Sequence, residues 1–104
     1  MQSNLKKRIG VDVGRRAKLE DALAWAAVNE VFYIDIQLDS GANAIEHFDE
    51  ARCETVKGMC QDHDIHLGLH TLSGVNMAEY SNFFRQAADE YLRAYIDMAT
   101  RLDA

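Results

Sequence analysis

The sequence contains no proline, no low-complexity tract and no linker-like stretch, so nothing divides its 104 residues into parts. With 48% hydrophobic and 27% charged residues, we expect residues 1–104 to form a single ordinary domain. Long apolar runs are also absent, since none approaches the about 20 residues that span a bilayer. The polar start Met1-Gln2-Ser3-Asn4 does not resemble a signal peptide. These absences predict a cytoplasmic chain without membrane contact.

Basic residues are outnumbered, with 11 Lys and Arg against 17 Asp and Glu and a net charge of -6. Proteins that bind a nucleic-acid backbone present clustered Lys and Arg, so nucleic acid is not an expected partner. The one basic cluster, Lys6-Lys7-Arg8 with Arg15 and Arg16, brackets the first predicted strand. Solvated strand flanks are the favoured interpretation of this cluster over a phosphate-binding site.

Cysteine is scarce as well, with only Cys53 and Cys60. In a helical pattern these two lie about 10 Å apart along the axis, which is too far for a disulfide. Neither has a CxxC partner or the spacing of metal ligands, so no metal site is assigned. They predict reduced thiols of a cytosolic protein.

What the chain does contain is an alternation of strands and helices. Period-2 patterns predict strands at 8–13, 31–38 and 65–70, and apolar stripes predict helices at about 17–27, 49–63 and 82–102, with Ser81 as a helix N-cap. The last helix repeats apolar residues at helical spacing over its whole length: Phe84, Ala88, Tyr91, Leu92, Tyr95, Ala99 and Leu102. Strands that alternate with helices predict a parallel sheet of the α/β class.

Each predicted strand has one apolar face and one face with polar or small residues. Sheets covered on both faces have strands that are apolar all round, so the helices are expected on one side only, as in a barrel wall. The predicted fold is therefore a partial (β/α)8 TIM barrel: three β/α units with a parallel three-stranded sheet. Such barrels place their sites at the carboxyl ends of the strands.

The polar faces provide the candidate site residues. The third strand ends in His70 and a polar loop, and Asp12, Asp35 and Gln37 lie on the matching faces of the other two strands, so these four residues are the predicted substrate-binding set. Simpler roles stay open, because a strand-end histidine can bond a neighbouring loop and an inward aspartate can anchor one. Two close carboxylates can also hold a metal or shift each other's pKa. Three other histidines are expected to be structural or to face solvent: His47, His63 and His66.

The segment 68–79, Gly-Leu-His-Thr-Leu-Ser-Gly-Val-Asn-Met-Ala-Glu, resembles the third strand and following loop of the xylose isomerase-like TIM barrels. This superfamily includes sugar-phosphate isomerases and epimerases and family-2 AP endonucleases. Residues 91–102 are similar to its third helix, and Ile9-Gly10-Val11-Asp12 and Tyr33-Ile34-Asp35 lie where its first two strands begin. The resemblance covers nearly all 104 residues but only about three-eighths of a fold of about 250 residues.

The resemblance implies the N-terminal part of a sugar-phosphate isomerase or epimerase, with His70 on the substrate side. The family's metal ligands come from later strands. The resemblance therefore implies no cofactor in these residues and a divalent metal in a full-length parent. It also implies that these residues alone do not turn over a substrate. In the nuclease branch the histidine is a metal ligand and a Pro-Tyr pair follows it. Thr71-Leu72 stands there instead, which disfavours a nuclease. A non-catalytic half-barrel that binds a small polyol or assembles with another chain stays an alternative.

Three parallel strands leave two open edges and one uncovered face, and unpaired strand edges invite association. We therefore expect a homo-oligomer in which copies cover each other's open edges.

Overall fold

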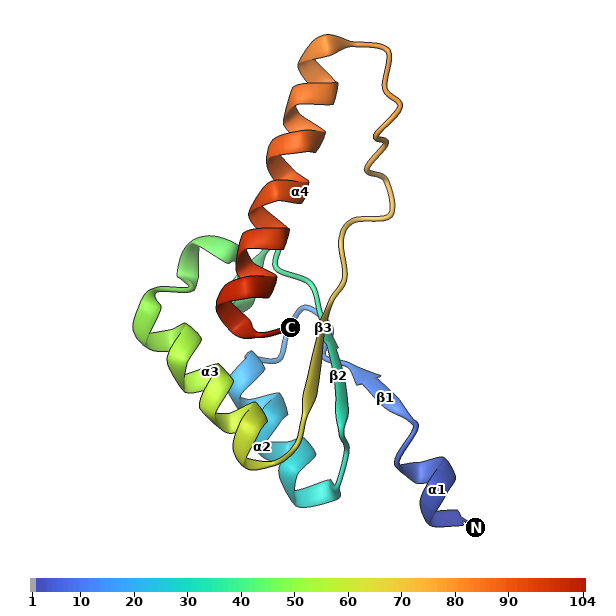
Figure 1. The fold of residues 1–104 in the computed structure, drawn as a ribbon, viewed down its shortest axis with the longest axis vertical. Helices are drawn as coiled ribbons and strands as arrows, with labels where there is room; N and C mark the ends of the chain where they lie inside the picture. The colour runs from blue at the N-terminus through green and yellow to red at the C-terminus, as the bar shows by residue number, and fades with distance from the viewer. Residues whose placement is uncertain (1) are drawn as a thin grey trace.

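A computed structural model describes residues 2–104 as an α/β fold built on a three-stranded parallel sheet in the order β1-β2-β3 (Figure 1). The strands are β1 (Gly10–Asp12), β2 (Tyr33–Ile36) and β3 (His66–Leu69). The predicted strands are confirmed in order and direction but are longer than the observed ones. The sheet is open, with β1 and β3 at its edges, so the barrel remains a prediction about how such a sheet could be completed.

The described part of the chain has four helices beside the sheet: α1 (Gln2–Lys6), α2 (Leu19–Asn29), α3 (Glu50–Asp62) and α4 (Asn82–Leu102). Two short 3-10 helices, η1 (Gly41–Asn43) and η2 (Ile45–His47), occupy the loop after β2. Apolar periodicity signals neither α1 nor the 3-10 turns, because α1 is polar and the turns are each three residues long. Within residues 2–104, no helix is both long and apolar enough to cross a membrane.

Helices α2, α3 and α4 pack on the same face of the sheet (Figure 1). Ile34, Ile36 and Leu67 point into this layer and are buried, while the alternate positions Tyr33 and His66 are exposed on the opposite face. The prediction that helices cover one side only is therefore confirmed, and the polar side of the sheet is left open.

Helix α4 extends well past the sheet. Its 21 residues measure about 31 Å at 1.5 Å per residue, and the buried ones, Tyr95, Met98 and Leu102, lie in the C-terminal half. Phe84 continues the same stripe but is 66% exposed, because the N-terminal half of α4 and the segment before it project beyond the core (Figure 1). Ser81 holds the N-cap position as predicted, yet its side chain makes no capping hydrogen bond.

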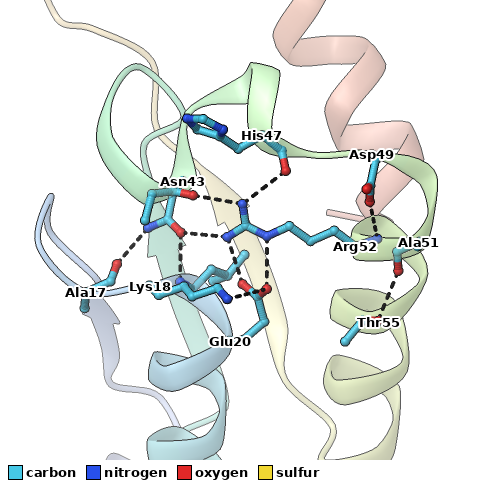
Figure 2. A network of polar contacts seen from close by, with 11 residues as sticks. Ala17, Lys18, Glu20, Asn43, His47, Asp49, Ala51, Arg52 and Thr55 are labelled. Carbon is cyan, nitrogen blue, oxygen red and sulfur yellow. Dashed lines mark hydrogen bonds and ion pairs between the residues drawn. The ribbon is translucent and has the colours of Figure 1, made fainter.

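A polar network fixes the long loop between β2 and α3 (Figure 2). The guanidinium of Arg52 donates two hydrogen bonds to the carboxylate of Glu20, at 2.9 and 3.0 Å. It also donates to the carbonyl oxygens of Ala42 and His47 and lies 4.0 Å from the centroid of the Phe48 ring. Arg52 therefore joins the start of α2, the loop and the start of α3.

Asn43 completes this network from the loop side. Its side chain is buried, and its Oδ1 accepts hydrogen bonds from the backbone N–H of Leu19 at 2.8 Å and from Arg52 at 3.2 Å. Its Nδ2 donates to the carbonyl oxygen of Ala17. Burial alone would raise the pKa of Glu20, but the hydrogen bond and charge of Arg52 outweigh it, so that pKa lies below its usual value.

Candidate functional site

Two of the predicted site residues form a direct pair on the open face of the sheet. His70 follows the last residue of β3, and its Nδ1 lies 3.1 Å from Oδ2 of Asp35 in β2. The backbone N–H of His70 donates to the carbonyl oxygen of Ile36 at 2.8 Å, which holds the histidine beside β2. Both side chains stay accessible, at 53% and 42% exposure. The pair lies at the carboxyl end of the sheet, where the strand pattern predicts a site.

The chemistry of this pair follows from its hydrogen bond. An ionised carboxylate can only accept hydrogen bonds, so Nδ1 of His70 carries the proton that faces Asp35. This contact orients the ring and selects the tautomer, which leaves Nε2 as the ring atom for a ligand. When the ring is neutral, Nε2 accepts a hydrogen bond from a ligand hydroxyl. When the ring is protonated, Nε2 donates a hydrogen bond to a ligand oxygen. The arrangement suits a ligand that offers hydroxyl or carbonyl oxygens.

Next to the pair, the open face carries a shallow hollow of about 460 Å³. Its lining includes Asp12, Asp35 and two positions without side chains, Gly10 and Gly68. A Cβ on Gly10 would come within 3.0 Å of the Cβ of Tyr33, and one on Gly68 within 3.4 Å of Oδ1 of Asp35. The absence of a side chain at Gly10 and Gly68 therefore leaves room for the side chains of Tyr33 and Asp35 in β2.

His66, for which the sequence predicts a structural role, also lies on this face. Its ring stacks on that of Tyr33, with centroids 5.2 Å apart and planes inclined by 23°. Tyr33 is the register partner of His66, and Asp35 is the register partner of Gly68. The stacked pair therefore lies two residues before Asp35 along the strands, on the same face of the sheet. Both side chains also line the hollow and give it an aromatic wall.

The other two predicted site residues are less engaged with the pair. Asp12 is the register neighbour of Asp35, but its Oδ1 accepts a hydrogen bond from the backbone N–H of Gly14 at 3.2 Å. This is the loop-anchoring role that the sequence left open, although Asp12 also lines the hollow. Gln37 directly follows β2 and is partly exposed.

A metal site is not assembled by the described part of the chain. Over residues 2–104, no three His, Cys, Asp or Glu side chains gather closely enough to hold an ion. Asp35 and His70 provide two donors, and the carboxylate of Asp12 is turned towards its own loop. The residues present therefore do not fit a complete divalent metal site, and no chemical step is assigned to one.

Sequence reasoning missed a second cluster, which joins α4 to the loops at this end of the sheet. The hydroxyls of Tyr91 and Tyr95 both donate to Oδ1 of Asp39, at 2.6 and 2.9 Å. In turn they accept backbone N–H groups, Tyr91 from Leu72 at 2.9 Å and Tyr95 from Leu38 at 2.8 Å. The cluster thereby ties the segments that follow β2 and β3 to α4. The sequence signal for this cluster is the pair of tyrosines one turn apart on an apolar stripe, because a buried Tyr hydroxyl usually has a polar partner.

These tyrosines give the fold a dependence on alkaline pH. Burial, with the hydrogen bonds to Asp39, raises the pKa of Tyr91 and of Tyr95 above the usual value for tyrosine. A group with a raised pKa in the folded state contributes stability below its unfolded pKa, near 10, and loses it as pH rises further. We expect the free energy of unfolding to fall above about pH 10. Urea unfolding at a series of alkaline pH values should show this fall, and it should be smaller in Tyr95→Phe; an equal fall in that variant would contradict the assignment.

The remaining titratable candidates lie away from this site. Cys53 and Cys60 are buried free thiols, as their spacing predicts, and burial raises the pKa of Cys60. His47 and His63 are exposed, as expected. In the basic cluster, Lys6 lies 3.6 Å from the carboxylate of Glu30 across a solvent-exposed contact.

Comparison of the chain with family models, curated proteins and solved structures finds no match in any of the three.

Proposed function

We propose that this chain supplies the first three strand-helix units of a barrel-type site for a small polyhydroxylated ligand of the sugar-phosphate class. The observation that carries the proposal is the Asp35–His70 pair, with 3.1 Å between carboxylate and imidazole on the uncovered sheet face. The pair leaves one histidine nitrogen for a ligand hydroxyl or carbonyl oxygen. The adjoining hollow of about 460 Å³ is of a size that suits a small ligand.

The reaction we propose for the completed site is isomerisation or epimerisation, in line with the resemblance of residues 68–79. This chain's part in it is to bind and orient the substrate. His70 contacts a substrate oxygen through Nε2 and Asp35 holds the imidazole ring in place. The aromatic wall of Tyr33 and His66 contacts the apolar face of a sugar. The groups that move the proton on carbon lie outside this proposal.

The binding step is testable on the chain as it stands. Imidazole and backbone NMR signals of ¹⁵N-labelled protein are followed during titration with an aldose phosphate, the parent aldose and inorganic phosphate. We expect saturable shifts at His70 and at residues 35–37 with both sugars. His70→Ala should weaken sugar binding by about 10-fold or more, which corresponds to the loss of one charge-assisted hydrogen bond.

The matched control is His63→Ala, which removes an exposed histidine at the opposite end of the sheet and should leave binding unchanged. Asp35→Asn should reduce binding less than His70→Ala, because an amide can still accept the proton of Nδ1. Shifts that inorganic phosphate reproduces in full, or shifts that persist in His70→Ala, would contradict the proposal.

A further inference from the structure

The two edges of the structure differ in a way that makes them complementary. At one edge, β1 and α2 border a hollow of about 310 Å³ whose lining includes the apolar side chains of Val11, Val13 and Trp25. Trp25 is the only tryptophan of the chain and is 49% exposed. We call this edge, together with the adjoining Lys7 and Arg8, the β1 flank. Asp12 and Asp21 also line this hollow, and the basic border consists of Lys7 and Arg8, which precede β1 in the chain.

The other edge has an acidic border. A hollow of about 370 Å³ lies beside the first half of β3, and its lining includes Leu67 and Leu102 with Asp64 and Asp103. We call this surface, with the exposed Asp62, the β3 flank. Lys57 and His66 also line the hollow: the ammonium of Lys57 lies 3.8 Å from the carboxylate of Glu54, and Nε2 of His66 lies 3.8 Å from Oδ1 of Asp64.

The opposite charges lie at matching heights along the sheet. Gly10, Tyr33 and His66 form one row across the three strands. Arg8 precedes that row by two residues on one edge, and Asp64 precedes it by two residues on the other. Both residues lie in the turns that lead into these edge strands, so a parallel sheet that continued from β3 into the β1 of another molecule would bring the two turns to the same end of the contact.

From this geometry we infer that the chain assembles head to tail, with the β3 flank of one copy bound to the β1 flank of the next. The occupant of each flank is a second copy of this chain, chosen by the basic border on one side and the acidic border on the other. The contact is heterologous, so it uses both flanks of every inner copy and forms either rings or short chains. Each contact extends the parallel sheet and covers the half-exposed Trp25.

This arrangement also bears on the candidate site without depending on it. The polar faces of adjoining sheets become one continuous surface, so the hollow beside Asp35 and His70 borders the polar face of the next copy. The assembly itself is measured without any ligand. A failure of the assembly and a failure of sugar binding are thus separate results.

Sedimentation velocity and tryptophan fluorescence over a concentration series test the inference. We expect wild-type protein to assemble as concentration rises, with a matching blue shift of Trp25 emission. Lys7→Glu/Arg8→Glu reverses the basic border, and Asp62→Lys/Asp64→Asn removes two of the three carboxylates of the acidic border. The second variant uses Asn at position 64 because that residue has a left-handed φ of 53°, which Asn tolerates. Each variant alone should raise the dissociation constant by about 10-fold or more.

Mixing the two variants in equal amounts is the decisive step. The unaltered acidic flank of one variant then meets the unaltered basic flank of the other, so assembly should return towards the wild-type level. Arg85→Glu, a reversal on the projecting half of α4, is the matched control and should assemble normally. A wild-type monomer at every concentration, assembly without a Trp25 shift, or a mixture no better than its components would each overturn the inference.

Discussion

Replacing Arg52 with methionine is expected to lower the free energy of unfolding by about 3 kcal/mol, because the mostly desolvated carboxylate of Glu20 loses its bidentate partner and keeps only the exposed ammonium of Lys18, 3.9 Å away. The side chains of Arg52 and Glu20 are only 13% and 19% exposed. The change also removes the hydrogen bonds to the carbonyl oxygens of Ala42 and His47. Urea unfolding followed by circular dichroism measures the loss.

A second substitution, at Glu20, should restore part of the stability that Arg52→Met loses. Adding Glu20→Gln to Arg52→Met removes the carboxylate charge that Arg52 no longer neutralises, so the double variant should recover part of the stability that the single variant loses. Arg52→Lys should lie between wild type and Arg52→Met, because an ammonium cannot reproduce the two-pronged contact with Glu20. Arg93→Met is the matched control, since that arginine pairs with Asp89 on an exposed helix face and should leave unfolding unchanged. If Arg52→Met and Arg93→Met lowered the free energy of unfolding equally, the network would not stabilise the loop as we infer.

Tyr95→Phe is expected to have the next largest effect, a loss of about 2 kcal/mol in the free energy of unfolding. The hydroxyl of Tyr95 accepts the backbone N–H of Leu38 and donates to Asp39, in a side chain that is buried. Phenylalanine preserves the packing of the ring but leaves the N–H of Leu38 without a partner. Removal of one partner of a buried hydrogen bond costs more than the bond contributes, because the other partner stays desolvated.

Tyr91→Phe provides the comparison for this change. Its hydroxyl makes the equivalent contacts with Asp39 and the N–H of Leu72, but Leu72 is in an exposed segment where water can replace the lost acceptor. We expect a clearly smaller loss than for Tyr95→Phe. Hydrogen exchange at the amide of Leu38 should quicken only in Tyr95→Phe. Equal losses in the two variants would show that burial does not distinguish the two hydroxyls.

The α/β class was predictable because the period of the apolar residues changes from two to about 3.6 and back along the chain. Residues 31–38 show this well, since Ile34, Ile36 and Leu38 alternate with polar residues and are buried. The exact ends of the strands were not predictable. They depend on which residues have a partner strand, and β1 pairs with β2 alone over three residues.

The candidate site was predictable as a set of faces but not as a set of contacts. The period-2 pattern was enough to assign Asp12, Asp35 and His70 to one side of the sheet. That Asp35 bonds His70 while Asp12 bonds Gly14 depends on the register between strands, which local sequence does not contain. The tyrosine cluster was hidden for a related reason. Tyr91 and Tyr95 fit an apolar stripe, and their partner Asp39 lies more than 50 residues earlier in the chain.

By itself, the sequence determined the alternation of strands and helices, the one-sided polarity of the sheet and the identity of the polar residues at its carboxyl end. These properties follow from side-chain spacing, which is a local quantity. Only the tertiary structure decided the length of each strand, the projection of α4 past the core, the pairing of His70 with Asp35 and the networks around Arg52 and Asp39. The physical reason is that each of these depends on atoms brought together from distant parts of the chain.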